Sequence, residues 1–118
     1  MANKSRRVGT EFENKLLQRL RDVFGDGVDR AKAGNKSDDF HGAPFPIEAK
    51  RRARWDIPAW VRSLRSVSRG DEWALFVAPR DLRRAEDRSL GTVMVVDWDF
   101  GLELLDVWHY HHYRRGGG

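Results

Sequence analysis

The fold that we predict depends most on one stretch of the chain, Asp38-Asp39-Phe40-His41-Gly42-Ala43-Pro44-Phe45-Pro46-Ile47-Glu48-Ala49-Lys50. Its middle part, residues 41–46, contains glycine and proline and is typical of a turn flanked by extended chain. Because alternate side chains of a strand share a face, Glu48 and Lys50 point to the same side of the second strand. A hairpin would bring Asp39 beside that pair.

Two carboxylates next to an ammonium group form a site for a hard divalent cation, with a lysine that can act on a water or phosphate oxygen. Nuclease chemistry needs this grouping. The alternative is a cross-strand ion pair on a solvated face. The apolar neighbours Phe40, Phe45 and Ile47 favour the catalytic interpretation, since a buried face would hold the polar side chains rigidly.

The composition is that of a single domain of 118 residues with one modest core. The formal charge is +4, from 22 Lys and Arg against 18 Asp and Glu, and this balance suits a phosphate-rich partner. The absence of cysteine excludes disulfides and thiolate metal sites. No apolar run reaches membrane-spanning length, so we expect no membrane association and a cytoplasmic protein.

The apolar spacing between Gly9 and Phe24 predicts an amphipathic helix, with Thr10 as its N-cap and Glu13 completing a capping box. We expect residues 1–8 to form a basic flexible arm, residues 9–113 to form the folded domain and residues 114–118 to be a disordered tail.

The rest of the chain predicts strands and helices in alternation. We expect strands over residues 28–33, 73–78 and 92–96, a helix after an Asp56 N-cap over residues 57–67, a charged loop over residues 79–91, and a closing helix over residues 100–108. The alternation at Leu102 and Leu104 leaves a strand possible there. The prediction is an α/β fold with a central mixed sheet flanked by helices, in the order αβββαββα.

This order resembles the core of the PD-(D/E)XK nuclease superfamily, and within it the small Holliday-junction resolvases of archaeal type and their phage relatives. The residues that carry the resemblance are Gly9-Thr10-Glu11-Phe12-Glu13, Val28-Asp29-Arg30, Asp39-Phe40 and Ile47-Glu48-Ala49-Lys50. The residue before Asp39 is Asp38, where the superfamily often has proline, so Asp38 is the alternative ligand. The resemblance covers roughly residues 9–78.

The resemblance implies a metal-dependent endodeoxyribonuclease. Glu13, Asp39 and Glu48, helped by the main-chain carbonyl of Ala49, would hold one or two Mg²⁺ ions, with Mn²⁺ as a substitute, and Lys50 would act on the attacking water or the phosphate. Glu13 has an alternative role in the capping box, and Glu11 is a nearby alternative ligand.

The expected substrate is branched DNA, which would place the protein in DNA recombination and repair. The expected DNA-binding residues are Arg6, Arg7, Arg30, Lys36, Arg51, Arg52 and Arg54. The alternatives are a non-catalytic DNA-binding module of the same fold and a nicking or restriction-type endonuclease. The many large apolar residues of the C-terminal half predict a homodimer, whose two sites would match the two-fold symmetry of a four-way junction.

Overall fold

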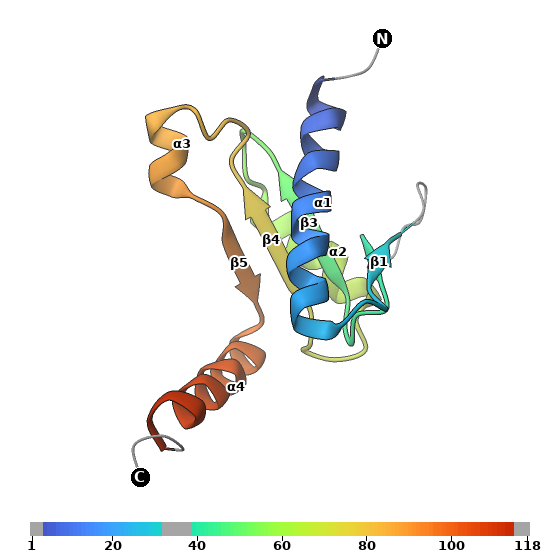
Figure 1. The fold of residues 1–118 in the computed structure, drawn as a ribbon, viewed down its shortest axis with the longest axis vertical. Coiled ribbons are helices and arrows are strands. Elements are labelled where there is room, and N and C mark those ends of the chain that lie inside the picture. Colours follow the sequence, from blue (N-terminus) through green and yellow to red (C-terminus); the bar gives the residue numbers. More distant parts are fainter. Residues whose placement is uncertain (1–3, 32–38, 115–118) are drawn as a thin grey trace.

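The computed structural model describes residues 4–31 and 39–114. At its centre is a three-stranded sheet with the strand order β3 (Ile47–Arg51), β4 (Ala74–Ala78) and β5 (Val93–Val96) (Figure 1). β3 runs parallel to β4, and β5 runs antiparallel to β4. The predicted α/β class with a mixed sheet is therefore confirmed.

Two helices lie on opposite faces of this sheet. α1 (Lys4–Phe24) covers one face, where Leu16, Leu17 and Leu20 share a buried cluster with Ile47, Ala49 and Ala74. α2 (Ile57–Val67) covers the other, where Leu64 shares a cluster with Trp73, Leu75 and Val77. Alternate residues of β4 thus enter different cores, which explains its uninterrupted apolar run. Each fully buried Leu or Val contributes roughly 1.5–3 kcal/mol.

The N-terminal prediction is wrong about where the first helix begins. α1 begins at Lys4, so residues 4–8 are helical and do not form a flexible arm, and Thr10 lies inside the helix and is not its N-cap. Gly9 costs about 1 kcal/mol of helix propensity, which a helix of 21 residues tolerates. Arginine, present at positions 6 and 7, is a good helix former and favours the extra turn.

The sequence predicts a hairpin in which residues 39–40 pair with residues 47–50, but the strand formed at residues 40–41 is not in the sheet that contains β3. β1 (Asp29–Arg30) pairs antiparallel with β2 (Phe40–His41) in a separate two-stranded ladder. The predicted strand over residues 28–33 is thus shorter, and residues 32–33 lie outside the described residues. The backbone N–H of Asp39 donates to the carbonyl oxygen of Ile47 at 3.0 Å, which attaches this ladder to the free edge of β3.

The helix predicted after Asp56 is confirmed. α2 begins at Ile57, the Asp56 carboxylate accepts from the backbone N–H of Ala59 at 3.3 Å, and Pro58 lies in the first turn. Pro58 fits there because its ring presets the helical φ angle and the first N–H groups of a helix have no partner within it.

The prediction of a loop over residues 79–91 is wrong, since α3 (Ala85–Leu90) lies within it. Glu86 and Asp87 occupy its first turn, where the helix dipole favours negative charge, and Gly91 ends the helix with φ of 68°. The strand predicted over residues 92–96 is present as β5 (Val93–Val96), and it is an edge strand with Met94 half exposed. Apart from α3, the described elements follow the predicted order.

The closing segment is helical, as predicted, and not a strand. α4 (Trp98–His109) starts at an Asp97 N-cap and continues into the π-helical turn η1 (Tyr110–Arg114). It extends away from the sheet and from α1 and α2 (Figure 1). Among the described residues, no helix has the length and apolar character needed to cross a membrane.

Gly42 offers a test of the turn that follows β2. Its φ is +80°, and an added Cβ would clash with the backbone carbonyl of Gly27. We expect Gly42→Ala to lower the free energy of unfolding by about 2 kcal/mol or more, from left-handed strain plus the clash. Gly27→Ala is the matched control, because a Cβ there meets nothing within 4 Å. Chemical denaturation measures both, and equal stabilities would contradict this account of the turn.

Candidate functional site

Asp39 is fixed to the edge of β3 by backbone and side chain together. Besides the bond from Asp39 to Ile47, the backbone N–H of Ala49 donates to Oδ2 of Asp39 at 2.7 Å. The Asp39 carbonyl accepts from the N–H of Ala31 at 2.8 Å. These bonds hold the carboxylate in a half-buried position where three segments of the chain meet.

Glu48 and Lys50 share a face of β3, as the sequence predicts, and point to the side covered by α2. Lys50 Nζ lies 2.8 Å from Glu48 Oε1, and the two side chains are only 22% and 13% exposed. Lys50 Nζ also lies 5.9 Å from the ring centroid of Trp60, a residue of α2. Because this pair is mostly shielded from water, its charges interact more strongly than those of a surface pair.

Glu13 approaches Asp39 from α1. Its Oε2 accepts from Arg30 Nη2 at 2.6 Å, and Arg30 Nη1 donates to Asn14 Oδ1 at 3.1 Å. Since α1 starts nine residues before Glu13, at Lys4, the capping-box role is excluded. The ion pair with Arg30 is what positions Glu13.

The electrostatics of Asp39 show how close these acids are. Burial, together with the neighbouring charges of Glu13 and Glu48, raises the pKa of its carboxyl from 3.8 to about 6. The hydrogen bond from Ala49 and the charge of Lys50 lower the same pKa but do not cancel the effect. A cation beside Asp39 would relieve this accumulation of negative charge.

The oxygen atoms that these residues offer are of the kind that binds a hard divalent cation. All three candidate side chains are carboxylates, and the Ala49 carbonyl faces the same strand edge as its N–H, toward Asp39. However, Glu13 is turned toward Arg30 and Glu48 toward Lys50. Within residues 4–31 and 39–114, these three acids are not among the groups whose oxygens all lie within 4.8 Å of one another. Joint ligation would require the outer carboxylates to rotate.

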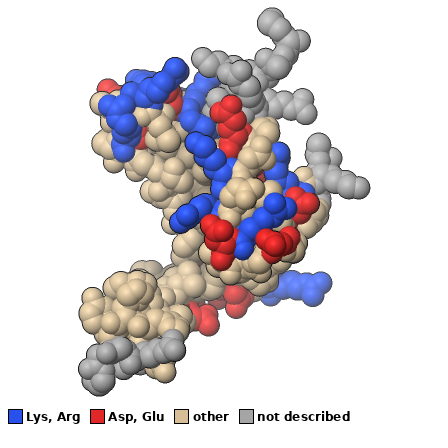
Figure 2. All heavy atoms as spheres, in the orientation of Figure 1, with Lys and Arg blue, Asp and Glu red and all other residues tan. Residues whose placement is uncertain are grey.

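The expected DNA-binding residues divide into different groups. Arg30 is bound to Glu13, and Arg51 Nε donates to the carbonyl of Pro79 at 3.2 Å, so both have structural partners. Arg52 and Arg54 are exposed beyond β3. Lys36 and the side chains of Arg6 and Arg7 lie outside the described residues, as does Asp38. On the face drawn in Figure 2, Lys and Arg alternate with Asp and Glu and do not form an uninterrupted basic patch.

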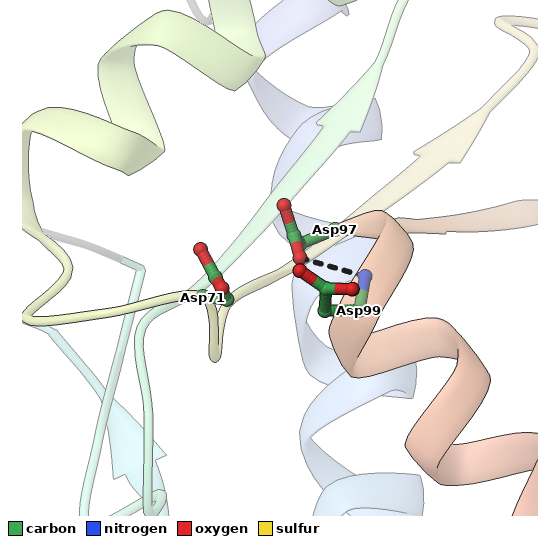
Figure 3. Close-up of side chains that lie close together, drawn as sticks. All are labelled: Asp71, Asp97 and Asp99. Atoms are coloured by element: carbon green, nitrogen blue, oxygen red, sulfur yellow. Dashed lines mark hydrogen bonds between the residues drawn. The ribbon is translucent and has the colours of Figure 1, made fainter.

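One acidic cluster was missed by the sequence reasoning. Asp71, Asp97 and Asp99 bring carboxylate oxygens within 4.8 Å of one another at the start of α4 (Figure 3). Asp97 Oδ1 accepts from Arg65 Nη2 at 2.6 Å, and this bond holds the pKa of Asp97 below its ordinary value. Asp97 Oδ2 caps α4 by accepting from the N–H of Asp99 at 2.9 Å. Arg65 and the helix cap explain this cluster without a metal.

The position of Trp60 beside Lys50 was missed by the sequence reasoning. No sequence signal identifies that contact, because it depends on how α2 lies across the sheet. Comparisons of the chain with protein-family models, with curated proteins and with solved structures found no match. The functional interpretation therefore depends on the geometry of the site.

The raised pKa of Asp39 predicts a cost to stability at neutral pH. The folded protein keeps the Asp39 proton up to about pH 6, whereas an unfolded Asp loses it near 3.8. The contribution of Asp39 to the free energy of unfolding is therefore fully present below pH 4 and is lost as the pH rises through 6. In metal-free buffer, Asp39→Asn should raise the free energy of unfolding at pH 7 by about 2–3 kcal/mol, but not at pH 4.

Urea denaturation at the two pH values measures this effect. Asp26→Asn, at an exposed position after α1, is the matched control and should change little at either pH. If Asp39→Asn were no more stable than the wild type at pH 7, the buried charge would carry no such cost.

Proposed function

We propose that this chain is a metal-dependent nuclease of the PD-(D/E)XK type whose site consists of Asp39, Glu48 and Lys50, with Glu13 as a further ligand. The observation that carries the proposal is the attachment of Asp39 to β3 through Ala49, which places a half-buried carboxylate beside the Glu48–Lys50 pair. A half-buried carboxylate whose pKa is raised by two further acids is costly to the fold, which favours a functional role for it.

Each residue has a distinct part in this proposal. Asp39 and Glu48, with the Ala49 carbonyl, supply the hard oxygen ligands. A Mg²⁺ or Mn²⁺ ion bound there would polarise the phosphate and lower the pKa of a bound water. Lys50, released from Glu48, would donate to the attacking water or to a phosphate oxygen on which negative charge develops. Trp60 would limit the movement of the Lys50 side chain.

We propose branched DNA as the substrate, following the resemblance to Holliday-junction resolvases; a nicking or restriction-type specificity uses the same site. A second function, non-catalytic DNA binding on the same fold, is favoured by the two ion pairs Glu13–Arg30 and Glu48–Lys50. Each supplies an acid of the site with a protein cation in place of a metal.

The deciding experiment incubates the protein with a labelled four-way junction and with a matching linear duplex, each with Mg²⁺, Mn²⁺ or EDTA. Metal-dependent cleavage supports the nuclease, and preference for the junction supports the resolvase-like specificity. Binding of DNA without cleavage in either metal would support the non-catalytic module and contradict the nuclease.

Side-chain variants test the site itself. Lys50→Met and Glu48→Gln should each reduce the single-turnover cleavage rate by about 100-fold or more while junction binding in EDTA stays within a few-fold of wild type. Glu86→Gln on α3 changes an equally charged but exposed residue and should leave the rate unchanged. A near wild-type rate for either site variant would show that the site is wrongly assigned.

Salt dependence tests the basic surface. Arg52 and Arg54 are exposed beside the site, so replacing both with Ala should weaken DNA binding and reduce the slope of log affinity against log salt by about 1–2. Arg83→Ala is the control, since its guanidinium already pairs with Asp81 at 3.0 Å. An unchanged slope in the double variant would exclude both arginines from phosphate contact.

A further inference from the structure

α4 carries a broad apolar surface that the described residues of its own chain leave exposed. Trp98 is 79% exposed, Leu105 63% and Trp108 51%. At 100° per residue, the apolar side chains of α4 spread over more than half of the helix circumference. Within α4, Phe100 is the buried residue, and it packs against Phe45 at a ring-centroid distance of 5.0 Å. An apolar helix of this kind usually marks an interface.

The opposite side of α4 is acidic. Asp99, Glu103 and Asp106 follow one another at spacings of four and three residues, so they form one stripe. Residues 98–109 contain these three acids and neither Lys nor Arg, so with a total charge of +4 the rest of the chain carries +7. The partner that fits α4 is therefore apolar at its centre and basic at its rim, which excludes a nucleic acid.

A groove with these properties lies on the α1 side of the sheet. It has a volume of about 250 Å³, larger than cavities that take up a benzene ring. Its apolar lining is Phe12, Leu16, Phe76, Ala78 and Leu82, and its basic lining is Lys15, Arg19 and Arg51. Met94 lies opposite Phe76 in the β4–β5 ladder and extends the apolar floor, since paired residues share a face.

The groove is not filled by the α4 of the same chain. Thr92, at its edge, immediately precedes β5, whereas α4 follows the other end of β5 and extends away from the groove (Figure 1). In Figure 2 the α4 region is mostly uncharged, while the body of the molecule carries many Lys and Arg side chains.

We propose that α4 of one copy packs into this groove of a second copy, and that the second copy returns the same contact. Trp and Leu side chains of the apolar surface enter the groove, and Glu103 and Asp106 lie along its basic rim. The exchange is reciprocal, so it closes as a two-fold dimer and does not continue into a fibre. This inference is independent of the proposed nuclease activity.

Light scattering after size-exclusion chromatography tests the proposal on the full chain. The wild type should have about twice the 13.7 kDa mass of one chain. The helix variant Glu103→Lys with Asp106→Lys places basic charge against the basic rim and should be monomeric. The groove variant Lys15→Glu with Arg19→Glu places acidic charge against the acidic stripe and should also be monomeric. Arg62→Glu with Arg69→Glu, both exposed and outside the groove, should remain dimeric.

Mixing the two monomeric variants gives the decisive result. In a heterodimer, the basic α4 of the helix variant meets the acidic groove of the groove variant, and the acidic α4 of the groove variant meets the basic groove of the helix variant. The mixture should therefore have the mass of a dimer. A monomeric wild type would overturn the proposal. A groove variant that stays dimeric would instead support pairing of α4 with α4. Thermal unfolding checks that each variant is folded, and folded variants that remain monomeric when mixed would also overturn the proposal.

Discussion

The hydrogen bond from the Ala49 backbone to the Asp39 carboxylate is the constraint on which the site depends. β1 and β2 form a ladder of only two residue pairs, too short to be stable by itself. The bonds of Asp39 to Ile47 and Ala49 attach this ladder to the sheet and bring Asp39 next to Glu48 and Lys50. Without that attachment, Asp39 would not lie between Glu13 of α1 and Glu48 of β3, and the candidate site would not form.

The alternation of side chains along β3 determines which groups the site contains. Ile47 and Ala49 face α1 and bury apolar surface, whereas Glu48 and Lys50 face α2 and remain mostly shielded from water. A shielded ion pair contributes little net stability, because desolvation offsets its Coulomb attraction. The apolar half of the strand therefore stabilises the fold, while the polar half, which would carry the proposed chemistry, contributes little to stability.

Because the chain is short, its helices leave large apolar surfaces exposed. A domain of 118 residues has a high ratio of surface to volume, and here α2 and α1 cover the two faces of β3 and β4 but leave β5 at the edge. Met94 of β5 and most of α4 are consequently exposed. These surfaces are on elements distinct from the Asp39 site, so the proposed dimer and the proposed nuclease site would use different parts of the fold.

The sequence by itself determined most of the helices and strands and the shared face of Glu48 and Lys50. Periodicity and the Asp56 cap predicted α2 and its start, and the period of two in residues 47–50 placed Glu48 and Lys50 together, since such patterns act over a few neighbouring residues. The helical start of α1, the short α3 and the edge position of β5 were missed. Only the tertiary structure decided that Arg30 holds Glu13, that Trp60 lies beside Lys50 and that burial raises the pKa of Asp39. Those contacts join residues from different elements, and their geometry depends on how the helices pack on the sheet. Local sequence patterns do not predict that packing.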